Sequence, residues 1–106
     1  MQPENPGRSS HAHIIDIDGK LLVRPSVVVL TKNEEFWLCN LTDSNDVRVC
    51  FEDPNVRPNW FTIEKSRKHG RVMSMEPGVY RYKVTVGGRP AHGESDPVII
   101  IDPPGN

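Results

Sequence analysis

The stretch that decides the fold is residues 77–104, PGVYRYKVTVGGRPAHGESDPVIIIDPP. It opens with a Pro-Gly turn and continues with residues 79–86, where β-branched and aromatic side chains recur as they do in a strand. A glycine-rich polar segment, residues 87–96, follows. Residues 98–101 are a continuous apolar run, typical of a strand buried in a sandwich core. The pattern therefore predicts a strand, a loop and a second strand.

The rest of the chain repeats this pattern on a shorter scale. Short apolar or β-branched segments alternate with turn-forming residues, and no stretch of ten or more residues has a helical period. Many short strands separated by turns are typical of an all-β sandwich or barrel. The expected strands before residue 77 are residues 11–17, 20–24, 27–30, 35–41, 47–51, 60–64 and 71–75.

Length and composition restrict the class of protein. A chain of 106 residues is one domain. Its 36% apolar and 25% charged residues are typical of a globular protein. The net charge of −1 provides no overall field that favours nucleic acid or an anionic membrane. No apolar run approaches the roughly 18 residues of a membrane span. We therefore expect neither nucleic acid nor a membrane as partner.

The N-terminal segment has the character of a tail. Residues 1–10, MQPENPGRSS, are polar and lack the apolar centre of a signal peptide. We expect a flexible tail followed by a domain over residues 11–104, and a cytoplasmic location; a leader removed from the chain is the alternative. The two cysteines, Cys39 and Cys50, fit either free thiols in a reducing compartment or one disulfide.

Taken together, these features resemble a cupredoxin, the Greek-key β-sandwich of the blue copper proteins. The resemblance rests on the order and spacing of residues 14–30 (IIDIDGKLLVRPSVVVL), 36–51 (FWLCNLTDSNDVRVCF), 77–84 (PGVYRYKV) and 95–102 (SDPVIIID). It implies a cupredoxin-like sandwich of seven or eight strands. An immunoglobulin-like domain is the rival all-β fold, but the two cysteines are too close in sequence for its Cys…Trp…Cys pattern.

The copper ligands of that family test the resemblance. A blue copper site needs two imidazoles, one thiolate and a weak axial ligand. The resemblance places the first imidazole at Asn45 or Asp46, the thiolate at Val84, the second imidazole at Gly87 or Gly88, and the axial ligand near His92. Valine has no ligand atom. The resemblance therefore implies a scaffold without type 1 copper, and we expect no cofactor.

An alternative metal site remains open. His11 and His13 are one residue apart, so on a strand they share a face. Two imidazoles can chelate Cu(II) or Zn(II), and His92 could add a third ligand. A metal-handling protein that binds copper or zinc through His11, His13 and His92 is therefore the second hypothesis.

Several other residues carry structural expectations. Residues 65–71, KSRKHGR, are most simply a solvated basic loop. Asn40 is expected to fasten the loop that follows it through its side-chain amide. Tyr80 and Tyr82 share a strand face and are expected to pack in the core.

Motifs for catalysis are missing from the sequence. It contains no nucleophile elbow and no phosphate-binding glycine loop followed by a helix. We expect a non-enzymatic binding or interaction module whose partner is an unknown protein or a small polar ligand. Binding groups gather on loops carried by a rigid sandwich. The candidate binding residues are Asp46, Trp60, Arg89, His92 and Glu94.

Overall fold

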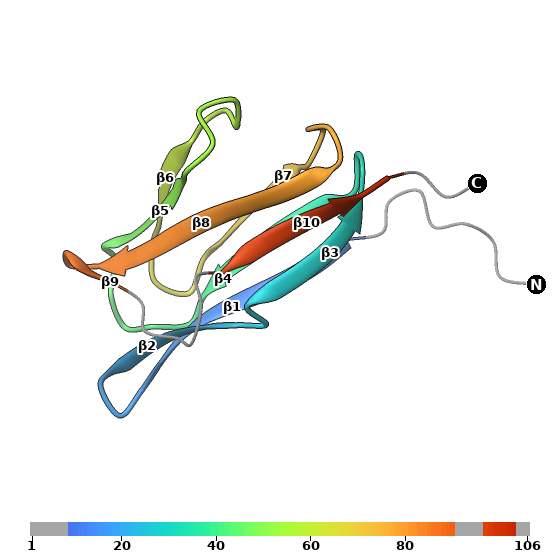
Figure 1. Cartoon of the computed structure of the whole chain (residues 1–106). Coiled ribbons are helices and arrows are strands. Elements are labelled where there is room, and N and C mark those ends of the chain that lie inside the picture. Colours follow the sequence, from blue (N-terminus) through green and yellow to red (C-terminus); the bar gives the residue numbers. More distant parts are fainter. Residues whose placement is uncertain (1–8, 91–96, 104–106) are drawn as a thin grey trace, which may run out of the picture.

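The structure is a computed structural model that describes residues 9–90 and 97–103 (Figure 1). These residues form ten strands, and they include no helix long and apolar enough to cross a membrane. The strands are β1 Ser9–Ile17, β2 Lys20–Arg24, β3 Val27–Thr31, β4 Glu35–Asn40, β5 Val47–Phe51, β6 Trp60–Ile63, β7 Lys68–Val72, β8 Gly78–Val86, β9 Arg89–Pro90 and β10 Val98–Asp102.

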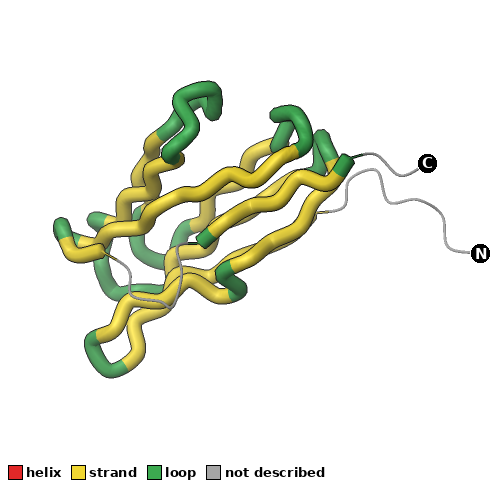
Figure 2. The backbone as a smooth tube through the Cα atoms, in the orientation of Figure 1, coloured by secondary structure: helices red, strands yellow, loops and turns green. Residues whose placement is uncertain are grey.

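Two sheets lie face to face (Figure 2). The four-stranded sheet has the order β2-β1-β4-β7, and the six-stranded sheet has the order β3-β10-β8-β5-β6 with β9 paired to β8. The pairs β1–β4 and β3–β10 are parallel, and the other pairs are antiparallel. This confirms the predicted all-β sandwich. The resemblance implied seven or eight strands and the sequence pattern marked nine segments; the short β9, paired to the end of β8, brings the number in the described residues to ten.

The core consists of the inward residues of both sheets. Burial alternates along β8, where Tyr80, Tyr82, Val84 and Val86 are buried and the residues between them face outward. The Tyr82 ring contacts the Phe51 ring at a centroid distance of 5.4 Å. The prediction that both tyrosines pack in the core is confirmed. The Tyr80 hydroxyl donates a hydrogen bond to a backbone carbonyl, whereas the buried Tyr82 hydroxyl has no partner among the described residues.

The sheet faces settle the state of the cysteines. On β4 the inward residues are Phe36, Leu38 and Asn40, so Cys39 is half-buried on the outer face. Cys50 lies on the outer face of the opposite sheet, between two inward residues of β5. The two thiols are on opposite outer faces of the sandwich and both are free.

Two strand boundaries differ from the sequence prediction. β1 begins at Ser9, inside the segment expected to be a tail, because it pairs with the start of β4. β7 spans Lys68–Val72, so the second half of the expected basic loop is a strand, and residues 73–75 lie outside it. β7 has no apolar alternation, because its inward positions are His69 and Arg71; pairing with β4 forms the strand instead.

Candidate functional site

The loop between β4 and β5, residues 41–46, is fixed by one buried amide. Asn40 is fully buried, and its Oδ1 accepts hydrogen bonds from the backbone N–H of Thr42 at 2.9 Å and from the Thr42 hydroxyl at 2.7 Å. Its Nδ2 donates to the carbonyl oxygens of Ser44 and Ile63, both at 2.9 Å. All four hydrogen-bonding positions of the amide are used. The predicted role of Asn40 in fastening the loop is confirmed.

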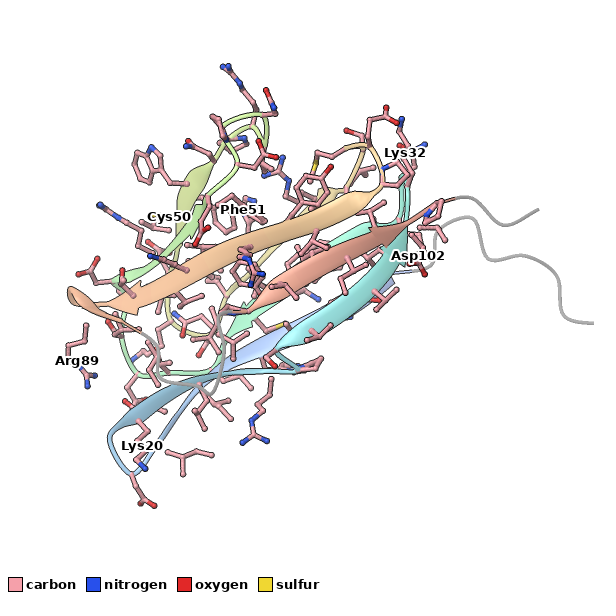
Figure 3. All side chains as sticks on the ribbon, viewed as in Figure 1. Lys20, Lys32, Cys50, Phe51, Arg89 and Asp102 are labelled. Atoms are coloured by element: carbon pink, nitrogen blue, oxygen red, sulfur yellow. The ribbon has the colours of Figure 1, made fainter. Side chains whose placement is uncertain are left out.

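The turn after β8 lies beside this loop. The backbone N–H of Gly87 donates to the Asp46 carbonyl at 3.1 Å. The Arg89 side chain points toward the β1–β2 hairpin, which carries Lys20 (Figure 3). Its guanidinium lies 3.9 Å from an Asp16 carboxylate oxygen and 3.4 Å from the Gly19 carbonyl. Asp46 and Arg89 thus lie at the same end of the sandwich, and the other two loop candidates, His92 and Glu94, lie outside the described residues.

The described residues at this end do not fit a type 1 copper site. Val84, at the thiolate position, is only 1% exposed and packs in the core. Its neighbours Val47 and Val86 are also buried and apolar, while Asp46 is exposed. Within residues 9–90 and 97–103, no group of three His, Cys, Asp or Glu side chains could hold a metal ion. The axial position predicted at His92 lies outside this part.

Trp60 lies apart from these loops. Trp60 is the first residue of β6 and lies on the outer face of the six-stranded sheet, opposite Cys50. The end of β6 that lies near the Asp46 loop is Ile63, which pairs with Val47. The indole is 54% exposed. The Arg48 guanidinium lies over it, 5.0 Å from the ring centroid. The structure therefore separates Trp60 from Asp46 and Arg89, and it pairs the indole with a cation that the sequence did not indicate.

A second cation lies on the same face. Lys83 of β8 is the register partner of Cys50, and its side chain is exposed. We call Arg48, Cys50, Trp60 and Lys83 the Trp60 face. Figure 3 shows Cys50 on the outer side of β5, with Phe51 directed into the sandwich. Arg48 lies over the exposed indole and Lys83 lies beyond Cys50 on the next strand, so this face carries two cations and one exposed aromatic ring.

The outer face of the four-stranded sheet carries the N-terminal histidines. His11 and His13 share this face, as predicted, because Ala12 between them is buried in the core. The His11 ring stacks on Trp37 at a centroid distance of 6.2 Å, and His13 is the register partner of Cys39. The predicted third ligand, His92, is outside the described residues.

Trp37 lies flat over Gly70, a contact that the sequence analysis missed. A Cβ added at Gly70 would lie 2.4 Å from the indole, so only glycine fits beneath the ring. The Lys68 ammonium lies 5.1 Å from the same ring centroid. A glycine in a strand indicates a close approach by a neighbour, and this signal was present in the sequence.

A cleft of about 480 Å³ lies near the loop between β5 and β6. Arg71 is its central group: the guanidinium donates to the Pro58 carbonyl at 3.0 Å and to the Arg57 carbonyl, and it lies over the Phe51 ring. Burial lowers the pKa of Arg71. The cleft is lined by Asp53, Asn55, Arg57, Arg71, Ser74, Met75, Glu76 and Tyr80.

His69 closes the same side of the sandwich. Its ring stacks on Phe61 of β6 at a centroid distance of 3.9 Å and an interplanar angle of 18°. Burial, and to a lesser extent the charge of Arg71, lower the pKa of His69. The stack joins the edge strands of the two sheets, so these inward polar groups serve the fold.

Comparison with known proteins identifies the architecture. No protein-family model matches the sequence, and no curated protein matches it. A purple cupredoxin from Nitrosopumilus maritimus is similar in structure, with a TM-score of 0.62 and 14% identity over 88% of this chain and 99% of that one. A copper binding protein in its apo form gives 0.60 and 16% over 95% and 93%, and auracyanin B gives 0.58 and 12% over 96% and 94%. The chain therefore has the cupredoxin fold.

Proposed function

We propose that the chain is a non-enzymatic binding module on a cupredoxin-like scaffold, and that its Trp60 face binds an acidic surface of a partner protein. The observation that carries the proposal is the exposed indole of Trp60 with the Arg48 guanidinium stacked over it. Tryptophan and arginine are the residues most enriched among those that dominate binding energy at protein interfaces. An exposed indole that already holds its cation loses little side-chain freedom on binding.

The two cations of the Trp60 face favour an acidic partner. Arg48 lies two residues before Cys50 on β5 and Lys83 lies opposite Cys50 on β8, and both cations are exposed. Carboxylates on a partner would form charge-assisted hydrogen bonds with both cations, and opposite fields speed the encounter. The apolar ring of Trp60 would be covered at the centre of the contact. An acidic protein segment with one apolar residue matches this arrangement.

The proposal includes no catalytic step and no cofactor. The four residues of the Trp60 face are two cations, an indole and a half-buried thiol. None of them is a carboxylate or imidazole able to exchange a proton near neutral pH. Metal handling through His11, His13 and His92 stays the second hypothesis: His11 and His13 share the outer face of the four-stranded sheet, and His92 lies outside the described residues.

Fluorescence titration tests the proposal directly. In a Trp37→Phe background Trp60 is the remaining indole, so its emission reports on its own surroundings. The protein is titrated with a glutamate-rich peptide that contains one leucine, and with the lysine-rich counterpart as the peptide control. We expect saturable binding of the acidic peptide that weakens with salt.

Two charge reversals provide the matched comparison. We expect Arg48→Glu to weaken binding by about 30-fold, the equivalent of a 2 kcal/mol hot spot, measured by the same titration. Arg24→Glu makes the same charge change at an exposed arginine of β2 and should alter binding less than about threefold. Equal weakening by both variants, or equal binding of the two peptides, would reject the Trp60 face as the site.

A further inference from the structure

The described residues form a sandwich with four edge strands, and within residues 9–90 and 97–103 one of these edges has no protecting feature. β2 carries Lys20 and Arg24 at its ends, and β7 carries Lys68 and Arg71. β6 is only four residues long. β3, by contrast, reads VVVLT, with no charge, no proline and no break in its pairing with β10. Proteins normally protect an open sheet edge with charged residues, prolines or a very short strand, because an unprotected edge can pair with strands of other chains.

The backbone groups on this edge follow from the pairing with β10. The backbone N–H of Val98 donates to the Ser26 carbonyl at 2.8 Å, and Val98 is the register partner of Val27. In a parallel ladder the bonded residues alternate, so Val28 and Leu30 face β10 while Val27 and Val29 face the open edge. Figure 1 shows β3 at that border of the sheet.

At the C-terminal end of β3, the backbone groups that face the open edge already form hydrogen bonds within the chain. The Thr31 N–H donates to Glu34 Oε1 at 2.6 Å, and the Thr31 carbonyl accepts from the Glu34 N–H at 3.1 Å. Among the described residues, Val27 and Val29 have no such bonds on the edge side. The open edge therefore offers one N–H and one carbonyl from each of two residues.

The side chains next to the edge are apolar and exposed. Val27 is 48% exposed and Val29 is 52% exposed on the outer face. Ile100, the neighbour of Val29 on β10, continues the row to Val79 of β8, which is 58% exposed. An apolar row that runs up to an open edge gains burial when a further strand extends the sheet.

We propose that β3 pairs antiparallel with β3 of a second copy about a twofold axis through Val28. In this register Val27 of each copy lies opposite Val29 of the other. Each such pair exchanges two hydrogen bonds, so both residues with open backbone groups are satisfied in both copies. Pro25, which has no N–H, lies opposite Thr31, whose N–H is already used. The free groups of β3 thus match those of β3 itself.

The charges beyond the strand are compatible with this register. Arg24 of one copy lies beside Lys32 of the other. The Lys32 ammonium is 2.8 Å from a Glu76 carboxylate oxygen, so Arg24 meets an ion pair instead of a lone cation. The proposed contact is confined to one pair of five-residue strands, and for such a weak association we expect a dissociation constant on the order of 10–100 µM.

Sedimentation measured from about 1 µM to about 1 mM tests the association, a range that spans the expected constant. Val29→Pro removes an edge N–H without removing a bond to β10, and Val29→Lys places a charge on the edge. We expect each variant to weaken dimerisation at least about tenfold. The control is Val72→Lys, at a valine 50% exposed on edge strand β7, and it should leave dimerisation unchanged. A wild-type chain that stays monomeric at the highest concentration would refute the proposal.

Disulfide trapping tests the register in a Cys39→Ser/Cys50→Ser background. The double variant Val27→Cys/Val29→Cys should form a covalent dimer on oxidation, because the two positions face each other across the axis at a Cα separation of about 5.5 Å. Val29→Cys alone should stay monomeric under reducing-agent-free gel analysis. Efficient trapping by Val29→Cys alone would place the axis elsewhere and overturn the proposed pairing.

Discussion

The two edges of the six-stranded sheet are built in opposite ways. At the β6 edge, Phe61 stacks on His69 of β7, and Arg71 of β7 donates to two carbonyls of the β5–β6 loop, so the gap between the sheets is closed by polar and aromatic contacts within the chain. At the β3 edge the exposed residues are valines, and the open backbone groups have no partner among the described residues.

The two edges differ in the source of their contacts. The Phe61–His69 stack and the Arg71 hydrogen bonds join β6 and the β5–β6 loop to β7 of the same chain. β3 lacks any such group and depends on water or on another strand. The Trp60 face, on the outer side near the β6 edge, is then free to contact a different kind of partner. Substitutions at Gly70, Arg71 and His69 of β7, with Val29 of β3 as the counterpart, test this contrast through their effect on stability.

The largest expected effect is at Gly70, which lies on β7 beneath Trp37. Gly70→Ala places a Cβ against the indole, so we expect the free energy of unfolding to fall by about 3 kcal/mol, as in overpacked sites. Urea denaturation measures the change. The double variant Trp37→Ala/Gly70→Ala should lose less than the two single variants together, because the clash is gone. Additive losses would show that Trp37 does not restrict this position.

A smaller effect is expected at Arg71. Arg71→Ala removes two hydrogen bonds to carbonyls and the contact with the Phe51 ring, which should lower the free energy of unfolding by about 2 kcal/mol in urea denaturation. Val29→Ala at the β3 edge should change it by less than about 0.5 kcal/mol, measured at a concentration where the chain is monomeric. Similar losses at the two positions would remove the contrast between the edges.

The smallest effect is the pH dependence of His69. Burial, followed by the charge of Arg71, lowers the pKa of this imidazole in the folded state. The folded chain therefore binds fewer protons than the unfolded chain near the ordinary histidine pKa of 6.5, and stability falls as the pH drops below that value. We expect a loss below about 1 kcal/mol, because solvent screens the partly exposed ring.

His69→Phe isolates this contribution. The variant keeps an aromatic ring against Phe61 and has no titrating group at this position, so its urea midpoint should vary less between pH 5 and 7, a window that brackets the histidine pKa. His11→Phe changes a histidine on the outer face and is the matched control. An identical pH profile for His69→Phe and the wild type would exclude His69 as the source.

Local patterns predicted most of the strands. The alternation in residues 79–86, the apolar run at residues 98–101 and the turn formers between short segments correctly indicated a sandwich, because burial of one face imposes a period of two. The role of Asn40 in fastening the following loop was also predicted from the turn-rich sequence beside it, whereas its burial was not. β7 was misplaced because its inward residues, His69 and Arg71, are polar and leave no periodic signal.

The candidate site was less predictable. Trp60 was among the candidate binding residues, although core packing is the ordinary role of a tryptophan, and only the structure places its indole on the exposed face of β6. Its partner Arg48 lies twelve residues earlier on a different strand, so only the pairing of β5 with β6 brings them together. The separation of Trp60 from Asp46 and Arg89 likewise depends on register: Val47, next to Asp46, lies opposite Ile63 and Val86, whereas Trp60 lies at the other end of β6.

The sequence by itself determined the fold class and the lack of a thiolate at Val84, because strand periodicity and ligand chemistry are properties of individual residues and their neighbours. The tertiary structure decided which strand faces are buried, that Cys39 and Cys50 lie apart, and which edges of the sheets are covered. Those outcomes depend on strand register between distant segments, in which a shift of one residue exchanges the inner and outer faces. The exposed β3 edge is the clearest example: its five residues look like any buried strand, and only their place at the border of the sheet leaves Val27 and Val29 open.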